Sequence, residues 1–144
     1  MSTHSLDYMR LTVCLMATLI LFFRAASVSA DQIVYPADIP NAEHFDDDGL
    51  VSIQKMVDEG HQPWRFDPEY YAKHFMNSYY PNLDPNEREK LPASLELKGH
   101  SAIVKIVYEG KEHVVYLQKA FPSNPESIWI VEKMAIRWVS SADT

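Results

Sequence analysis

The chain has 144 residues, a formal net charge of −7 and a single cysteine, Cys14. An acidic chain without a basic run offers little to a phosphate backbone, so its composition argues against nucleic-acid binding. One cysteine cannot form an intrachain disulfide, so core burial alone must stabilise the fold.

The first thirty residues have the pattern of a secretory signal peptide. An uncharged apolar run from Leu11 to Phe23 follows Arg10, and a stretch of small residues ends at Ala30. A membrane-spanning helix needs about 20 apolar residues, so an uncleaved anchor is the less favoured alternative. We expect removal of residues 1–30 and export as a secreted or periplasmic protein without a membrane partner. Translation from Met1 and translation from Met9 both fit this pattern.

Residues 31–49 are rich in Pro, Asp and Asn and show no hydrophobic period, which is typical of an extended N-terminal arm. The single α+β domain is then expected over residues 50–140. Leu50 and Val57 lie on one helical stripe and Gly60 suits a left-handed cap, so we predict a helix over residues 49–59.

The aspartates at positions 46–48 precede Gly49 and resemble part of a calcium loop. If Gly49 occupied the glycine position of an EF-hand loop, Lys55 would replace the required bidentate glutamate. The spacing favours Asp47 or Asp48 as the N-cap of the helix instead. No two histidines have the spacing that brings two ligands together on one helix, so we predict no metal site and no cofactor.

Asp67-Pro68 predicts the start of a second helix, because Asp is a good N-cap and Pro fits the first helical position. The helix should end near Tyr80. Asp84-Pro85 repeats the signature before a short helical turn through Lys90. The core stripe of the second helix is expected to contain Ala72, Phe75, Met76 and Tyr79.

From Ala93 the hydrophobic period becomes two, which is typical of β-strands. Glycine-containing and proline-containing turns divide this half into four strands at about residues 94–98, 102–109, 112–120 and 127–139. Glu132 in the last strand fits the solvent face, a bulge or a pocket. The predicted fold class is α+β, with two N-terminal helices packed on a four-stranded antiparallel meander.

The strand sequences Ala102 to Ile106, Val114 to Leu117 and Ile128 to Val131, placed after helices, resemble the curved-sheet superfamily of cystatin-like and nuclear-transport-factor-like domains. The resemblance covers residues 50–139. The segment Gly60 to Pro68 also resembles a recurring block in small exported bacterial proteins of unassigned function. Cystatin-type protease inhibition would imply a Gln-x-Val-x-Gly hairpin, which the segment Lys105 to Gly110 does not match.

We expect a non-enzymatic binding or accessory module whose partner, a protein or a small ligand, is unknown. Its candidate binding residues are Trp64, Arg65, Tyr70 and Tyr71, because Trp, Tyr and Arg are enriched at binding hot spots. The same aromatic residues could instead fill the core.

The alternative function is a small pocket enzyme, which the nuclear-transport-factor-like resemblance implies would use a pocket carboxylate or histidine. Its candidate catalytic residues are Asp67, Glu69 and His74. The sequence has no Gly-x-Ser-x-Gly elbow and no glycine-rich phosphate loop, so other common catalytic motifs are missing.

Overall fold

The computed structural model describes residues 30–139, so the predicted signal peptide lies outside the described residues except for Ala30. In the labels used here, η marks a 3-10 helix. The elements are β1 (Gln32–Val34), η1 (Pro36–Asp38), α2 (Asp47–Asp58), η2 (Pro63–Phe66), α3 (Pro68–Tyr79), α4 (Pro85–Lys90), β2 (Ala93–Lys98), β3 (Ser101–Tyr108), β4 (Lys111–Lys119) and β5 (Trp129–Trp138).

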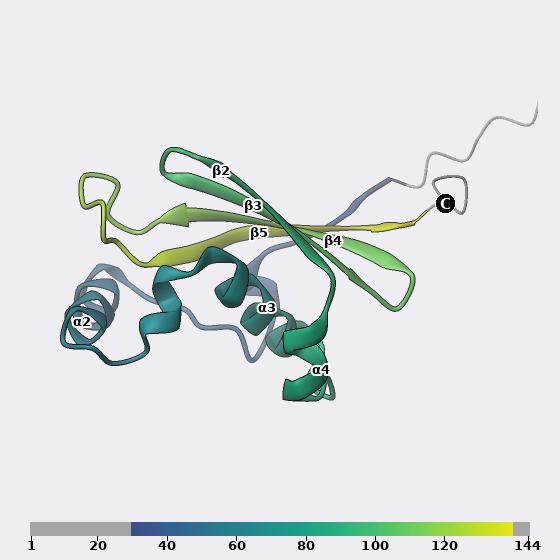
Figure 1. The fold of residues 1–144 in the computed structure, drawn as a ribbon, viewed down its shortest axis with the longest axis horizontal. Helices are drawn as coiled ribbons and strands as arrows, with labels where there is room; N and C mark the ends of the chain where they lie inside the picture. The colour runs from purple at the N-terminus through teal and green to yellow at the C-terminus, as the bar shows by residue number, and fades with distance from the viewer. Residues whose placement is uncertain (1–29, 140–144) are drawn as a thin grey trace, which may run out of the picture.

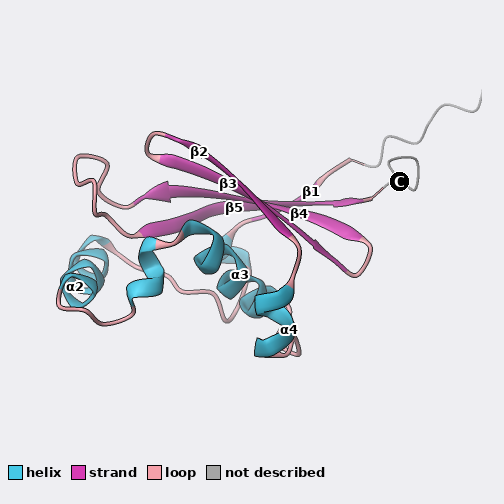
Figure 2. Cartoon of the chain, viewed as in Figure 1, coloured by secondary structure: helices cyan, strands magenta, loops and turns pink. Residues whose placement is uncertain are grey.

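The strands form one antiparallel sheet in the order β1-β5-β4-β3-β2. Figure 1 and Figure 2 show the helices on one side of this twisted sheet. The predicted α+β class is confirmed. The predicted counts do not match, because residues 30–139 contain five strands instead of four, and the short helical turn expected through Lys90 is a third α-helix, α4.

The additional strand comes from the segment predicted to be an extended arm. Gln32 to Val34 pairs with β5, from Gln32 opposite Ile136 to Val34 opposite Met134. A strand of three residues is too short to show a period of two in the sequence, which explains why it was missed. Val34, Ile39 and Ala42 are buried in the main core, so this segment contributes to both the sheet and the core.

The N-cap of α2 is Asp46, whose carboxylate accepts a hydrogen bond from the Gly49 amide at 2.8 Å. The helix therefore begins at Asp47, two residues earlier than predicted, and neither Asp47 nor Asp48 is the cap. The predicted C-terminal cap is confirmed, since Gly60 has a φ of 89°. The amides of Gly60 and His61 bond back to the carbonyls of Val57 and Met56, as in a Schellman motif.

The start of α3 is as predicted. The Asp67 carboxylate accepts hydrogen bonds from the amides of Glu69 at 2.9 Å and Tyr70 at 3.1 Å. Of the predicted stripe, Ala72, Phe75 and Met76 are buried and Tyr79 is half-buried. This face of α3 packs on the inward side chains of β3, β4 and β5, which are Ala102, Val104, Ile106, Val115, Leu117, Met134 and Ile136.

The last strand contains a bulge at Glu132. Tyr116 pairs with Lys133 and Leu117 pairs with Val131, which leaves Glu132 as the extra residue. Its carboxylate is exposed and accepts a hydrogen bond from the Gln118 amide at 2.8 Å. The sequence left the solvent face, a bulge or a pocket open for Glu132. The structure places it in a bulge, with its side chain on the solvent face.

Candidate functional site

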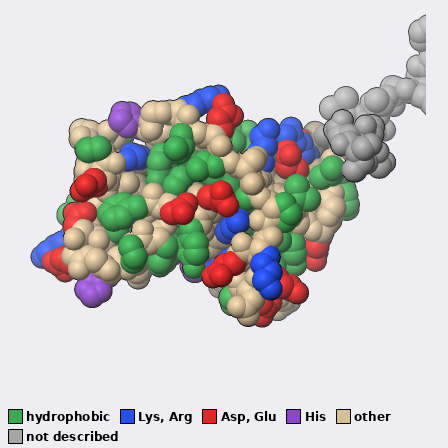
Figure 3. Space-filling view, in the orientation of Figure 1, with side chains coloured by type: hydrophobic (Ala, Val, Ile, Leu, Met, Phe, Trp, Pro, Cys, Tyr) green, Lys and Arg blue, Asp and Glu red, His purple; other side chains and the backbone are tan. Residues whose placement is uncertain are grey.

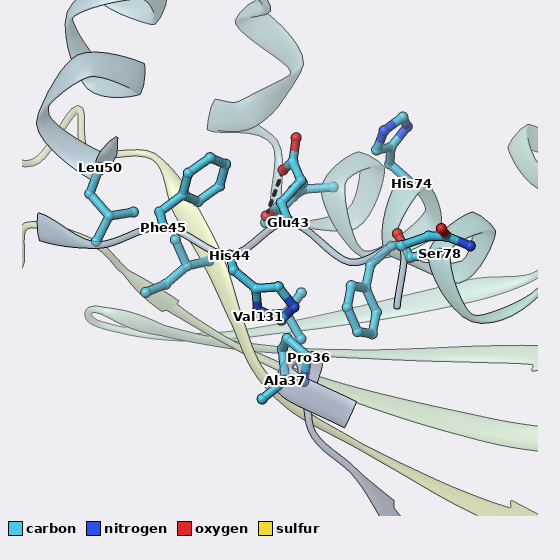
Figure 4. A pocket seen from close by; sticks show the side chains of 13 residues that line it. Pro36, Ala37, Glu43, His44, Phe45, Leu50, His74, Ser78 and Val131 are labelled. Carbon is cyan, nitrogen blue, oxygen red and sulfur yellow. Dashed lines mark hydrogen bonds between the residues drawn. The ribbon is translucent and has the colours of Figure 1, made fainter. Parts of the chain in front are cut away.

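The main cleft lies between the segment after β1, the side of α3 and the start of β5. Its volume is about 490 Å³, within the range typical of small-molecule sites. Figure 4 shows Glu43, His44, His74 and Ser78 among apolar side chains in this cleft. The lining residues are Pro36, Ala37, Asn41, Glu43, His44, Phe45, Leu50, Tyr71, His74, Phe75, Ser78, Ile130 and Val131.

A second hollow of about 430 Å³ lies on the other side of Asn41 and Ser78, which line both spaces. It is formed by β1, the loop after η1 and the end of α3. Its lining includes Val34, Ile39 and Tyr79. Neither space is lined by a lysine or an arginine, so the charged side chains that a ligand would meet are acidic or imidazole groups.

Glu43 is the only carboxylate that lines the main cleft, and it is fixed by Arg65. Arg65 Nη2 lies 2.6 Å from Glu43 Oε1, and Arg65 Nε donates to Gln62 Oε1 at 2.7 Å. The Arg65 side chain is 2% exposed while that of Glu43 is 39% exposed. The guanidinium therefore lies behind the carboxylate, and only the carboxylate is available to a ligand.

Three aromatic rings surround the Arg65 guanidinium. Its Cζ atom lies 4.7 Å from the ring centre of Trp64 and 5.6 Å from those of Phe45 and Tyr71. Such contacts stabilise a cation that has left water. Arg65 Nη1 is buried and has no hydrogen-bond partner. The three rings and the Glu43 carboxylate therefore offset much of the free-energy cost of removing the guanidinium charge from water.

Tyr71 donates a long hydrogen bond of 3.5 Å to Glu43 Oε2. Burial first, and then the negative charge of Glu43, raises the pKa of Tyr71 to about 12. The phenol therefore remains protonated and a donor near neutral pH. Because the contact is long, Oε2 retains capacity to accept a shorter hydrogen bond from a ligand.

His74 lines the cleft from α3 and contacts Arg88 behind it. Arg88 Nη1 lies 3.1 Å from His74 Nδ1 and 3.0 Å from Asn77 Oδ1. Arginine only donates, so Nδ1 must accept, and the neutral ring carries its proton on Nε2. Burial, then the positive charge of Arg88, lowers the pKa of His74. Near neutral pH the imidazole is thus a hydrogen-bond donor at Nε2 and not a free base.

The residues predicted from the sequence separate into two groups in the fold. Trp64 packs against Tyr70, Tyr71 and His74, with ring centres 6.1, 5.9 and 4.7 Å apart. Arg65 lies beside the same indole ring. The four candidate binding residues and His74 therefore form one cluster, although only Tyr71 and His74 line the main cleft.

Asp67 and Glu69 lie away from this cleft. Asp67 accepts the two capping hydrogen bonds of α3, and Glu69 forms an ion pair of 2.9 Å with Lys73. Both line a smaller hollow of about 210 Å³ beside Tyr70 and Arg88. The structure therefore does not bring the three candidate catalytic residues together.

Sequence reasoning did not select Glu43, His44 or Arg88. Glu43 and His44 belong to a segment without hydrophobic periodicity, and Arg88 belongs to a helix of six residues. The roles of Glu43 and Arg88 depend on contacts with residues at least eleven positions away, namely Glu43 with Arg65, and Arg88 with Asn77 and His74. One indication of the site's position was present in the sequence: Trp64 and Arg65 lie just before helix α3 along the chain.

A second buried polar pair lies outside the cleft, between the end of α3 and β4. Tyr80 Oη is 2.7 Å from His113 Nε2, and His113 is fully buried. Burial is the main cause that lowers the pKa of His113 and raises that of Tyr80 to about 12. Both groups are therefore neutral near pH 7.

Within residues 30–139, no three side chains of His, Cys, Asp or Glu are grouped so that they could hold a metal ion. None of the helices in that part of the chain has the length and apolar character needed to cross a membrane. The chain matches no protein family model, no curated protein and no solved structure.

Proposed function

We propose that this chain is a non-enzymatic binding module whose main cleft takes a small, largely apolar ligand with a hydrogen-bond-donating amine. The observation that carries this proposal is the Glu43 carboxylate, which Arg65 fixes at 2.6 Å and which faces a cleft without lysine or arginine. Preorganisation of this kind lowers the entropic cost of binding.

The apolar part of the ligand would contact the walls formed by Phe45, Phe75, Ile130 and Val131. Its amine would donate to Glu43 Oε2, which has only the long contact with Tyr71. The Nε2 proton of His74 offers a donor to an acceptor group elsewhere on the ligand. A few polar groups in a mainly apolar cleft are the usual composition of a small-molecule site.

The enzyme alternative has less support from the contacts of its candidate residues. Asp67 caps α3, Glu69 pairs with Lys73, and His74 accepts a hydrogen bond from Arg88 at Nδ1, the ring nitrogen that carries the free lone pair in this tautomer. A base must be free to accept a proton from its substrate. Binding requires no such freedom, and the geometry of Glu43 suits it.

Export is part of the same proposal. The signal-like segment before Asp31 would direct the chain out of the cytoplasm. In the exported domain, which has no cysteine, the hydrophobic core would have to provide the stability. The helix-on-sheet arrangement is compatible with the resemblance to cystatin-like and nuclear-transport-factor-like domains, which we retain as a proposal.

The test compares hexylamine, a cation at neutral pH, with the neutral 1-hexanol by isothermal titration calorimetry. We expect the wild-type chain to bind hexylamine more tightly. Glu43→Gln should remove this preference, whereas Glu59→Gln, a matched change of an exposed glutamate outside the cleft, should retain it.

Because Glu43→Gln could also weaken the fold, a second variant keeps the ion pair intact. Ala37 is exposed and lines the cleft, so Ala37→Trp should fill the space without touching Arg65. Binding of both probes should then be lost while the melting temperature is maintained. Unchanged binding of hexylamine by a folded Ala37→Trp variant would refute the proposal.

A further inference from the structure

Strand β2 forms one edge of the sheet and has no partner strand on its outer side. Figure 1 shows it along the open edge, with no described element beyond it. The opposite edge, β1, has only three residues, whereas β2 has six and no proline. An edge strand of this length with no proline can be a template for pairing with another chain.

The register identifies which backbone groups of β2 are unpaired. The Val107 amide donates to the Pro92 carbonyl at 3.2 Å, and Pro92 would be opposite Val107 in the register of β2 and β3. Hydrogen-bonded pairs alternate along an antiparallel ladder. Ser94, Glu96 and Lys98 therefore bond to β3, which leaves the amides and carbonyls of Ala93, Leu95 and Leu97 directed toward the open edge.

The same edge exposes two large apolar side chains. Leu95 is 39% exposed and Leu97 is 59% exposed, although they are paired with Val104 and Ala102, which are fully buried. Both leucines lie on the helix side of the sheet, where Figure 3 shows hydrophobic side chains between the strands and the helices. The charged residues Glu96 and Lys98 lie on the opposite side and form an ion pair with each other at 2.9 Å.

We propose that β2 pairs with β2 of a second copy of this chain, antiparallel, with Leu95 opposite Leu95 on the two-fold axis. This register places Ala93 of each copy opposite Leu97 of the other, so the exposed leucines of both copies become covered. It also uses all the outward backbone groups of Ala93, Leu95 and Leu97. Two five-stranded sheets would thereby join into one.

The alternative registers are less favourable. A shift that centres the axis on Glu96 would place two carboxylates directly opposite each other, which is destabilising. A shift that centres it on Leu97 would place Leu95 opposite Gly99, which belongs to the turn after β2 and has a φ of 58°. The proposed register places Glu96 opposite Ser94 instead, so a carboxylate faces a hydroxyl donor. In the proposed register the same strand therefore supplies both members of every pair: Leu95 with Leu95, Ala93 with Leu97 and Ser94 with Glu96. This complementarity of β2 with itself is the reason for proposing a second copy of the chain as the partner.

The register predicts specific disulfide cross-links in the full chain carrying Cys14→Ser. Hydrogen-bonded residues on antiparallel strands have Cα atoms about 5.5 Å apart, which suits a disulfide. Leu95→Cys should therefore form covalent dimers on mild oxidation. Ala93→Cys and Leu97→Cys should form them only when the two variants are mixed. Ser52→Cys, on the exposed side of α2, is the control for random collision.

A proline substitution tests the backbone pairing. The Leu95 amide points away from β3, so Leu95→Pro should leave the existing sheet intact while removing a central hydrogen-bond donor of the dimer. We expect sedimentation equilibrium to show dimerisation weakened by at least about tenfold, with Leu95→Ala affected less and the circular dichroism spectrum unchanged. A chain that remains monomeric at all concentrations, or cross-links through Leu97→Cys alone and not through Leu95→Cys, would overturn the proposal.

Discussion

Arg65 and Glu43 form an ion pair whose two members differ in exposure, because the arginine side chain is 2% exposed and the glutamate side chain 39%. The consequence of losing either partner should differ accordingly. Loss of Glu43 leaves a buried guanidinium without its counter-charge, whereas loss of Arg65 leaves a carboxylate that water can reach.

We predict that Glu43→Ala lowers the free energy of unfolding by about 3 kcal/mol, the lower end of the cost of stranding a buried charge. Arg65→Met should cost less, because methionine retains apolar contact with the rings of Trp64, Phe45 and Tyr71. Urea denaturation of both variants measures the difference. A larger loss for Arg65→Met would show that the hydrogen bond to Gln62 and the packing of the side chain matter more than the charge.

Asp67→Ala should lower the free energy of unfolding by about 1 kcal/mol, because it removes the side-chain cap of α3. Asp67→Asn retains an oxygen acceptor for the Glu69 and Tyr70 amides and should recover most of the loss. Denaturation midpoints of the three proteins test this. If Asp67→Ala has the midpoint of the wild-type chain, the cap does not contribute to stability.

The cap of α3 was predictable from the sequence because it depends on neighbours within three residues. Asp67 was identified from the proline that follows it, and the buried stripe of α3 from its spacing. The cap of α2 was misplaced because three consecutive aspartates precede Gly49, and all three have the chemistry of a cap. Only the backbone shows that Asp46 accepts the hydrogen bond from Gly49.

The cleft was not predictable in the same way. Its acidic group, Glu43, comes from a segment that has no hydrophobic periodicity. The residue that fixes it, Arg65, lies 22 residues further along the chain. Trp64 and Arg65 were selected as candidate binding residues from their side-chain types. The fold places them behind Glu43, where they support a carboxylate that residue type alone could not identify.

Cleavage of the exported chain is predicted between Ala30 and Asp31. The small residues at positions 28–30 suit a signal peptidase, and Arg24 ends the apolar run. N-terminal sequencing of protein recovered outside the cytoplasm should begin at Asp31. Recovery of a membrane-bound form that retains residues 11–23 would contradict the prediction.

Trp64→Ala should lower the free energy of unfolding by about 2 kcal/mol, less than the 3 to 5 kcal/mol typical of a fully buried tryptophan. The indole is half-buried and packs against the core, so its removal exposes the Arg65 guanidinium on one side. Trp64→Phe retains a ring near Arg65 and should cost less. Denaturant midpoints of the two variants and the wild-type chain test this order. An unchanged midpoint for Trp64→Ala would indicate that the Trp64 side chain contributes to binding and not to stability.

The last prediction concerns pH and the buried pair of Tyr80 and His113. Burial lowers the pKa of His113 in the native state below its ordinary value of 6.5, and the unfolded chain keeps the ordinary value. As the pH falls through 6.5, the unfolded state therefore binds more protons than the native state, and the free energy of unfolding decreases. The contribution of His113 to the free energy of unfolding is therefore fully present above pH 6.5 and is lost as the pH falls. The pKa of His74 is also lowered in the native state, so His74 makes the stability fall with pH in the same way.

We expect the urea midpoint to be constant between pH 8 and pH 7 and to fall as the pH is lowered toward 5.5, a range above the ordinary pKa values of aspartate and glutamate. His113→Gln does not titrate and keeps a hydrogen-bonding group for Tyr80. It should lower the midpoint at pH 8 but reduce its dependence on pH, and adding His74→Gln should reduce that dependence further. An undiminished pH dependence in the double variant would mean that groups other than His74 and His113 control the acid sensitivity of the fold.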